Sequence, residues 1–165
     1  MNKYLTGIIL AGTVFVGATA FSGRTGAVVG KFAPELDICL VGQKSNDSVD
    51  FRNTGEGYKL INFWTASDVD SRLKGKIYTK WLENSEFQNN KLNYLSVNLD
   101  EDERLFREII KIDRLKEDSQ YACGNSSRKI IKEYDLQNGM KTFLVDSKGE
   151  IVMINPSTED IEKLL

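Results

Sequence analysis

The segment 59–64, KLINFW, constrains this chain most, because it is an almost uninterrupted apolar run bounded by turn residues. Such a run is typical of a strand that is buried on both faces of a sheet. The period then changes, since Val69, Leu73, Ile77 and Trp81 recur every four residues among charged side chains. This spacing predicts an amphipathic helix of about four turns, with these four residues on its apolar face and Tyr78 and Leu82 beside them.

Strand and helix patterns continue on both sides of this pair. Residues 36–41 and 49–52 are short strand-like runs that predict a hairpin, and residues 92–99, LNYLSVNL, alternate as a strand. Residues 100–113 predict a helix, because three acids at its start suit the positive end of the helix dipole. The apolar face of that helix is expected to consist of Leu105, Phe106, Ile109, Ile110 and Ile112.

The C-terminal third predicts two more helices around a second hairpin. Residues 124–126, GNS, are expected to cap a short helix, and residues 157–160, STED, a terminal one. Between them, 142–146 and 150–154 form a predicted hairpin, in which Gly149 takes the turn position that requires a positive φ. The alternation of strands and helices makes the chain an α/β protein.

Residues 1–20 have the composition of a secretory signal. A cation at Lys3 precedes an uncharged apolar run that ends in Ala18-Thr19-Ala20, a small-x-small cleavage pattern. The alternative is an uncleaved N-terminal membrane anchor, and contact with a membrane is expected only in that case. We expect a Gly-rich linker at 21–30 and a single domain at 31–165, because 165 residues suffice for one core.

Composition excludes several classes of function. The chain has no histidine, which removes Ser-His and Cys-His nucleophiles and His-ligated metals, and two cysteines cannot form a Cys₄ zinc site. A net charge of −2 gives no basic surplus for nucleic acid. We therefore expect no metal, no cofactor and no nucleic acid. If the chain is exported, Cys39 and Cys123 are candidates for one disulfide, and the alternative is two inert core thiols.

Four short motifs follow one another along the chain. They are residues 29–36, VGKFAPEL; 62–64, NFW; 134–136, YDL; and 142–149, TFLVDSKG. Together they resemble the exported thioredoxin-like proteins of the TlpA/ResA type, over residues 28–165. The resemblance implies a thioredoxin-like fold, with a central mixed β-sheet flanked by helices and here an N-terminal β-hairpin extension. It also implies thiol–disulfide oxidoreductase chemistry and a bacterial periplasmic or envelope location.

Both places that carry the chemistry of that family differ here. The family motif N-F-W-x-x-x-C-x-x-C-R aligns without a gap with residues 62–72, NFWTASDVDSR. Asp68 therefore stands at the position of the nucleophilic cysteine and Ser71 at that of the resolving cysteine. Met140 stands where the family has a cis-proline. A cis bond before a non-proline residue costs about 3 kcal/mol, so we expect a trans bond there.

Two interpretations of Asp68 and Ser71 remain open. Aspartate keeps a negative charge at a helix start but cannot form a sulfur–sulfur bond, and serine is redox-silent. Both residues are also good helix caps, so they could serve the helix alone. On the other interpretation they mark a reused binding cleft, for which Trp64, Thr65, Asp68 and Met140 are the candidate binding residues. Trp64 is also expected to be a core residue, at the edge of that surface.

The leading hypothesis is a redox-inactive, exported thioredoxin-like domain that acts as a binding, chaperone-like or accessory module. Its partner would be an exported protein or peptide at the former active-site surface. The alternative is an enzyme, either a thiol–disulfide oxidoreductase or a thiol peroxidase-like protein that uses Cys39 or Cys123. That role is disfavoured because neither cysteine opens a predicted helix after the central strand, where a thiol is activated.

Overall fold

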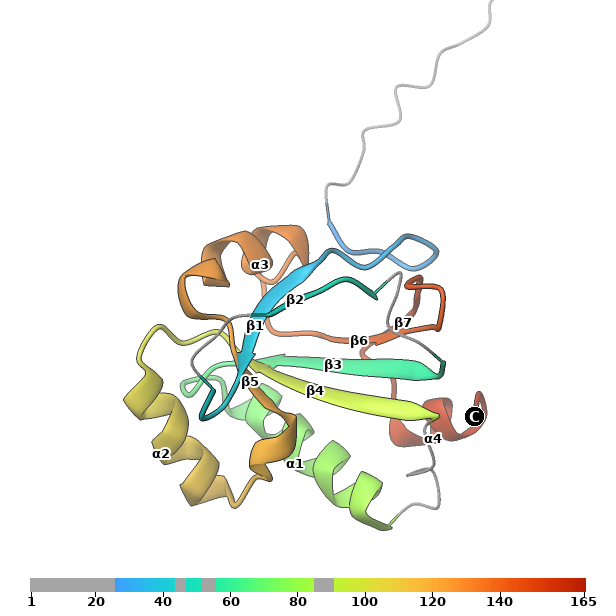
Figure 1. Cartoon of the computed structure of the whole chain (residues 1–165). Helices are drawn as coiled ribbons and strands as arrows, with labels where there is room; N and C mark the ends of the chain where they lie inside the picture. Colours follow the sequence, from blue (N-terminus) through green and yellow to red (C-terminus); the bar gives the residue numbers. More distant parts are fainter. Residues whose placement is uncertain (1–25, 44–46, 52–55, 85–90) are drawn as a thin grey trace, which may run out of the picture.

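A computed structural model describes residues 26–43, 47–51, 56–84 and 91–165. The expected signal segment 1–20 lies outside the described residues, as does most of the expected linker. The described strands form one mixed sheet in the order β2-β1-β5-β4-β3-β6-β7 (Figure 1). They are β1 (Leu36–Leu40), β2 (Asp47–Val49), β3 (Tyr58–Trp64), β4 (Leu92–Asn98), β5 (Gln120–Ala122), β6 (Thr142–Val145) and β7 (Ile151–Ile154).

The pairing of the strands confirms the predicted mixed sheet. The central strand β3 runs parallel to β4, and β4 runs parallel to β5. The pairs β1–β2 and β6–β7 are antiparallel, as predicted for the two hairpins, and Gly149 in the second turn has a φ of +89°. Six of the seven residues of β3 are buried, as expected of a strand covered on both faces.

The helices cover the sheet unequally (Figure 1). α3 (Ser127–Glu133) lies on one face, where Ile130 packs with Ile61 and Phe63 of β3. The other face carries α1 (Val69–Asn84), α2 (Glu103–Asp113) and α4 (Thr158–Glu162). Ser157 and Asp160 form a capping box at α4, which confirms the predicted helix start.

Most of the apolar face predicted for α1 points away from the sheet, and of its four residues only Trp81 packs against the core, together with Tyr78 and Leu82. Val69, Leu73 and Ile77 are exposed by 70%, 54% and 50%, and the buried residues of the helix are Ser71, Gly75 and Tyr78. The small residues Ser71 and Gly75 face the sheet, because the polar side chains of Asn62 and Tyr94 lie under this part of the helix. A Cβ on Gly75 would stand only 3.2 Å from Asn62 Nδ2, so nothing larger fits there without a shift.

Two further predictions need correction. Residues 124–126 do not cap a helix with their side chains but form a 3₁₀ turn, η4 (Gly124–Ser126), in front of α3. Strand β5 was not predicted, because three residues are too few to show a period. It is preceded by another 3₁₀ turn, η3 (Glu117–Ser119). Of the predicted apolar face of α2, Leu105 and Ile112 are exposed and the other three residues are buried.

The chain packs onto the domain from its first described residues. Ala27, within the segment expected to be a linker, is buried, and its N–H donates a hydrogen bond to the carbonyl of Glu133. Gly30 N–H donates to the carbonyl of Ile151 in β7. No helix in the described ranges is both long enough and apolar enough to cross a membrane.

Candidate functional site

Asp68 caps α1 directly after the central strand. Its Oδ1 accepts a hydrogen bond from the N–H of Ser71 at 3.0 Å, which satisfies one of the free amides at the helix start. Ser71 Oγ in turn donates to the carbonyl of Asp68 at 3.0 Å. Ser71 is buried and Asp68 is half-buried. The two oxygen-bearing side chains thus occupy the N-terminus of α1 together, and each serves the backbone there.

The loop between β3 and α1 is held by a residue that the sequence analysis did not single out. Asp100 Oδ2 accepts hydrogen bonds from Ala66 N–H and from Asn98 Nδ2, both at 2.7 Å. The sequence showed Asp100 only as one acid among several before a helix. Its role depends on the side-by-side placement of β3 and β4, which brings residues 66 and 100 together.

Arg72 ties the start of α1 to the end of α2. Its Nε donates to Asp113 Oδ2 at 2.9 Å, and another of its nitrogens donates to the carbonyl of Ala66 at 3.1 Å. The Asp113 side chain is only 8% exposed and also has Lys76 Nζ at 3.5 Å. The loop before α1 is therefore fixed from both sides, by Asp100 and by Arg72.

Met140 lies beside the start of α1, as the alignment implied. The peptide bond before it is trans, in agreement with the prediction, and it follows Gly139, whose φ is +129°. A shallow groove of about 390 Å³ separates this loop from α1. Its lining residues are Asp68, Asp70, Ser71, Leu73, Lys74, Ile77, Gly139 and Met140.

Not every predicted binding residue belongs to this groove. Trp64 is 2% exposed and packs on Phe106 of α2 with ring centroids 5.7 Å apart, so it cannot contact a ligand directly. Trp64 is therefore a core residue, as expected, and not a binding residue, because α2 covers the end of β3. Thr65 is half-buried in the loop, where its carbonyl accepts from Asp68 N–H and its hydroxyl lies 3.4 Å from that of Ser67. Asp68 and Met140 are thus the two candidates that line the groove.

Both cysteines are free thiols, which corrects the candidate disulfide. Cys39 lies opposite Ala122 across the β1–β5 pair, so the two thiols are near in the sheet. However, Ala122 packs with the Trp64–Phe106 core, and Cys123 packs with Ile130 in the core on the α3 side. Since the two cores lie on opposite faces, the sulfur atoms are separated by the sheet.

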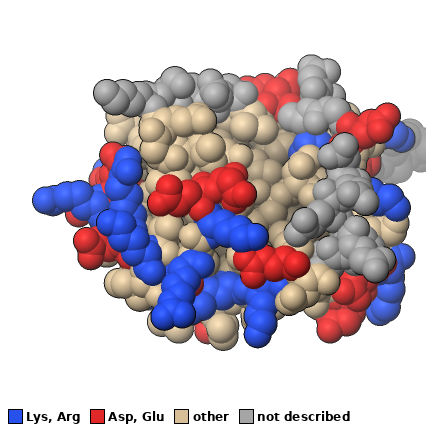
Figure 2. Space-filling model, turned by 60° about the horizontal axis from the view of Figure 1, so that its bottom comes forward, with Lys and Arg blue, Asp and Glu red and all other residues tan. Residues whose placement is uncertain are grey.

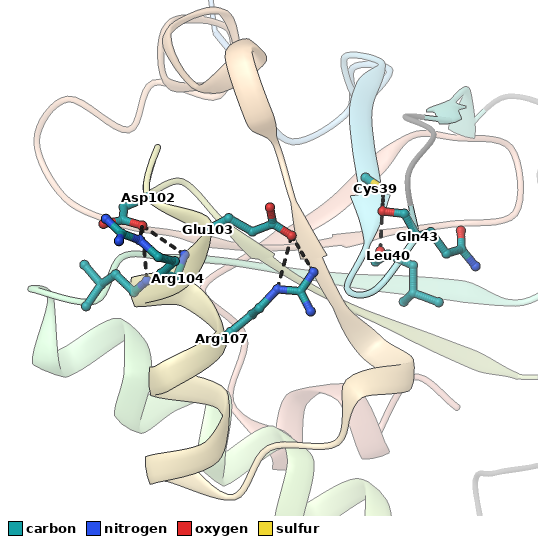
Figure 3. Close-up of polar contacts among 8 residues, drawn as sticks. Cys39, Leu40, Gln43, Asp102, Glu103, Arg104 and Arg107 are labelled. Atoms are coloured by element: carbon teal, nitrogen blue, oxygen red, sulfur yellow. Dashed lines mark hydrogen bonds and ion pairs between the residues drawn. The ribbon is translucent and has the colours of Figure 1, made fainter.

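Cys39 lines a second, larger cleft of about 650 Å³ between the β1 turn and α2. Its thiol donates to the carbonyl of Gln43 at 3.2 Å (Figure 3). Across the cleft, Arg107 is paired with Glu103 on α2. Figure 3 shows that the thiol points to its own turn and that the charged pair lies on the far side. The thiol also donates to the carbonyl of Leu40, so its described hydrogen bonds go to main-chain oxygens.

Burial keeps Cys123 in the thiol form. Desolvation raises the pKa of Cys123 to about 11, and the nearby carboxylates Asp100 and Glu101 act in the same direction. A thiolate, which is the form that attacks disulfides and peroxides, is therefore scarce at neutral pH. In the described ranges, no group of three or more Cys, Asp or Glu side chains is placed to hold a metal ion.

The fold is the thioredoxin-like fold, since solved structures of that class match most of this chain. A thioredoxin-like protein from Parabacteroides distasonis is 30% identical, with 84% of this chain and 95% of that chain covered and a TM-score of 0.68. The thioredoxin domain of a thiol-disulfide oxidoreductase from Bacteroides vulgatus is 22% identical, with 84% and 99% covered and a TM-score of 0.70. Neither a family model nor a curated protein matches the sequence.

The sequence identity to the Parabacteroides distasonis protein, over most of both chains, is high enough to establish the family of this chain. The chain belongs to the thioredoxin-like proteins. The fold and the family membership agree with the resemblance drawn from the four sequence motifs.

Proposed function

We propose that this protein is a redox-inactive thioredoxin-like domain that binds a polypeptide in the groove between α1 and Met140. The observation that carries the proposal is the start of α1. The amides and dipole that activate a thiol in a redox protein are here engaged by Asp68 and Ser71, which cannot exchange disulfides. Neither thiol of the chain lies at this helix start, because Cys39 is in β1 and Cys123 precedes η4.

The groove has the character of a recognition site. Leu73, Ile77 and Met140 give it apolar walls, and Asp70 and Lys74 place charges of both signs at its edge. Methionine suits a surface that must adapt to different apolar side chains, since it is flexible and polarisable. Such a surface supports a chaperone-like or accessory role. We also propose that the domain is exported, because residues 1–20 have the pattern of a secretory signal.

A thiol–disulfide exchange assay tests the loss of redox activity. The protein is added to a disulfide-bonded model protein with dithiothreitol, and the rate of reduction is measured. We expect the same rate with and without the protein. Acceleration that disappears in Cys39→Ser or Cys123→Ser would refute the proposal in favour of a thiol enzyme.

A binding experiment tests the groove. A fluorescently labelled, reduced and carboxymethylated model protein serves as a permanently unfolded ligand, and its anisotropy is measured against added domain. We expect Met140→Gln to weaken binding several-fold. The matched control is Met153→Gln, which makes the same change at another half-buried methionine, in β7 and outside the lining of the groove. Equal affinities for both variants would contradict the assignment of the groove.

A further inference from the structure

The exposed stripe on α1 is more extensive than the groove needs. Val69, Leu73 and Ile77 stand on three successive turns of one helix and are each at least half exposed. They are three of the eight large hydrophobic side chains exposed in the described ranges, and the remaining five are spread over other elements. A stripe of this spacing normally packs against another element. Here no described element covers it.

The direction of the stripe is fixed by the packing under α1. Gly75 lies against Asn62 and Tyr94, and Tyr78 Oη donates to the carbonyl of Pro156 at 2.6 Å. Turning the helix inward would bury larger side chains against these polar groups and break the Tyr78 hydrogen bond. Because α1 cannot rotate, Val69, Leu73 and Ile77 remain at the surface of the isolated domain.

Charges along α1 indicate what can cover the stripe. Asp68 and Asp70 stand at its N-terminal end, and Lys74, Lys76 and Lys80 follow over the next turns. Asp70 and Lys80 are exposed, and neither forms an ion pair with another described residue. Figure 2 shows that the face carrying α1, α2 and α4 mixes acidic and basic side chains with uncharged surface. Arg72 and Lys76 are paired with Asp113, and Glu83 is paired with Lys116, so the complementary charges that remain are Asp70 at the start of α1 and Lys74 and Lys80 further along it.

We propose that the stripe binds the same stripe of a second copy of this chain, with the two α1 helices antiparallel and the two-fold axis near Leu73. In this arrangement Val69 of one copy meets Ile77 of the other, and the acidic start of each helix lies beside the lysines of its partner. A parallel arrangement would place like charges together. Self-complementarity of both the apolar and the charged residues therefore selects the antiparallel pair.

The size of the surface sets the strength of the association. A helix of 16 residues is about 24 Å long, so two such helices side by side bury less than the roughly 1,600 Å² of a standard interface. The dimer is therefore weak and depends on concentration. The stripe shares Leu73 and Ile77 with the groove, so a dimer would cover part of the proposed polypeptide site, but Val69 lies outside the groove and Met140 lies outside the stripe. Val69 variants therefore test the dimer and Met140 variants test the groove. The two proposals can fail separately.

Cysteine cross-linking of the full chain tests the register. All variants carry Cys39→Ser, so that the only native cysteine left is the buried Cys123. Under mild oxidation, Leu73→Cys is expected to form a disulfide-linked dimer by itself. Val69→Cys and Ile77→Cys are expected to cross-link mainly when the two variants are mixed. Cross-linking of Val69→Cys with itself as efficiently as with Ile77→Cys would overturn the antiparallel arrangement.

Sedimentation of the full chain over a range of concentrations provides the second measurement. We expect a monomer–dimer equilibrium whose dissociation constant rises at least tenfold in Leu73→Asp, while Ile112→Asp on α2 leaves it unchanged. Leu73 and Ile112 are both exposed, so both variants are expected to keep the fold. Circular dichroism checks that they do. A monomer at every concentration, or an association that Leu73→Asp leaves intact, would overturn the proposal.

Discussion

Helices α1 and α2 lie on the same face of the sheet, and each follows one of two neighbouring parallel strands, yet they turn different kinds of side chain to the core. Each begins at an aspartate, Asp68 or Asp102, that accepts hydrogen bonds from backbone amides of the first turn. α2 buries Phe106, Ile109 and Ile110, as an amphipathic helix normally does. α1 buries Ser71, Gly75 and Tyr78 and exposes its apolar stripe.

α2 stabilises the fold through its apolar face, whereas the apolar stripe of α1 is left at the surface. The large apolar residues of α2 are buried and contribute to the free energy of folding. The stripe residues Val69, Leu73 and Ile77 of α1 are at the surface, where they contribute little to folding. Tyr78, Trp81 and Leu82 of the same helix pack against the core. The same period in the sequence therefore has opposite consequences on the two helices.

The largest difference in stability is expected between alanine variants of two isoleucines, one on each helix. Ile110→Ala on α2 removes a side chain that is 3% exposed, and we expect it to lower the free energy of unfolding by about 2–5 kcal/mol. Ile77→Ala on α1 makes the same chemical change at a side chain that is 50% exposed, and we expect a change within about 0.5 kcal/mol. Urea unfolding at low protein concentration measures both. Equal losses would show that α1 also packs through its stripe.

The cap of α1 is expected to have an intermediate effect. Asp68→Ala removes the acceptor of the Ser71 amide, so we expect the free energy of unfolding to fall by about 1 kcal/mol. Asp70→Ala, two residues further on and exposed, is the matched control and should stay within about 0.5 kcal/mol of the wild type. If the two variants are equally stable, Asp68 does not cap the helix.

The cap of α2 gives the smallest effect, which depends on pH. Hydrogen bonds from the Arg104 and Leu105 amides lower the pKa of Asp102 below its ordinary value. Because the pKa is lower in the folded than in the unfolded chain, the stabilisation is present above about pH 4 and is lost as the pH falls through the folded value. Asp102→Asn keeps a cap but does not titrate. We expect its stability to fall less steeply than that of the wild type between about pH 5 and pH 2; parallel curves would contradict this role.

The sequence predicts most of the sheet and both hairpins, because strands such as 59–64 and turns such as that at Gly149 carry strong local patterns. It also locates Asp68 and Met140, since both depend on an alignment of local motifs. It does not predict the direction of α1, which is set by Asn62 and Tyr94 under Gly75. A glycine in the middle of a predicted helix was the available signal for close packing there.

The remaining errors have the same origin in long-range contacts. Trp64 ends a strand, so the sequence allows either a core position or one at the edge of the former active-site surface, and only the packing of α2 over it decides for the core. Cys39 and Cys123 are on different sides of the sheet because of the β1–β5 pairing, and β5 is too short to be recognised from sequence. Likewise, Asp100 holds the α1 loop only because β3 and β4 are neighbours.

On this account, the start of α1 would stabilise a thiolate but here holds the oxygen-bearing side chains of Asp68 and Ser71. The most direct test measures the thiol introduced by Asp68→Cys in a Cys39→Ser background, through the pH dependence of its alkylation rate. The helix dipole and the free amides predict a pKa below about 7.5 for this thiol. A value at or above the ordinary value of about 8.5 would contradict the claim.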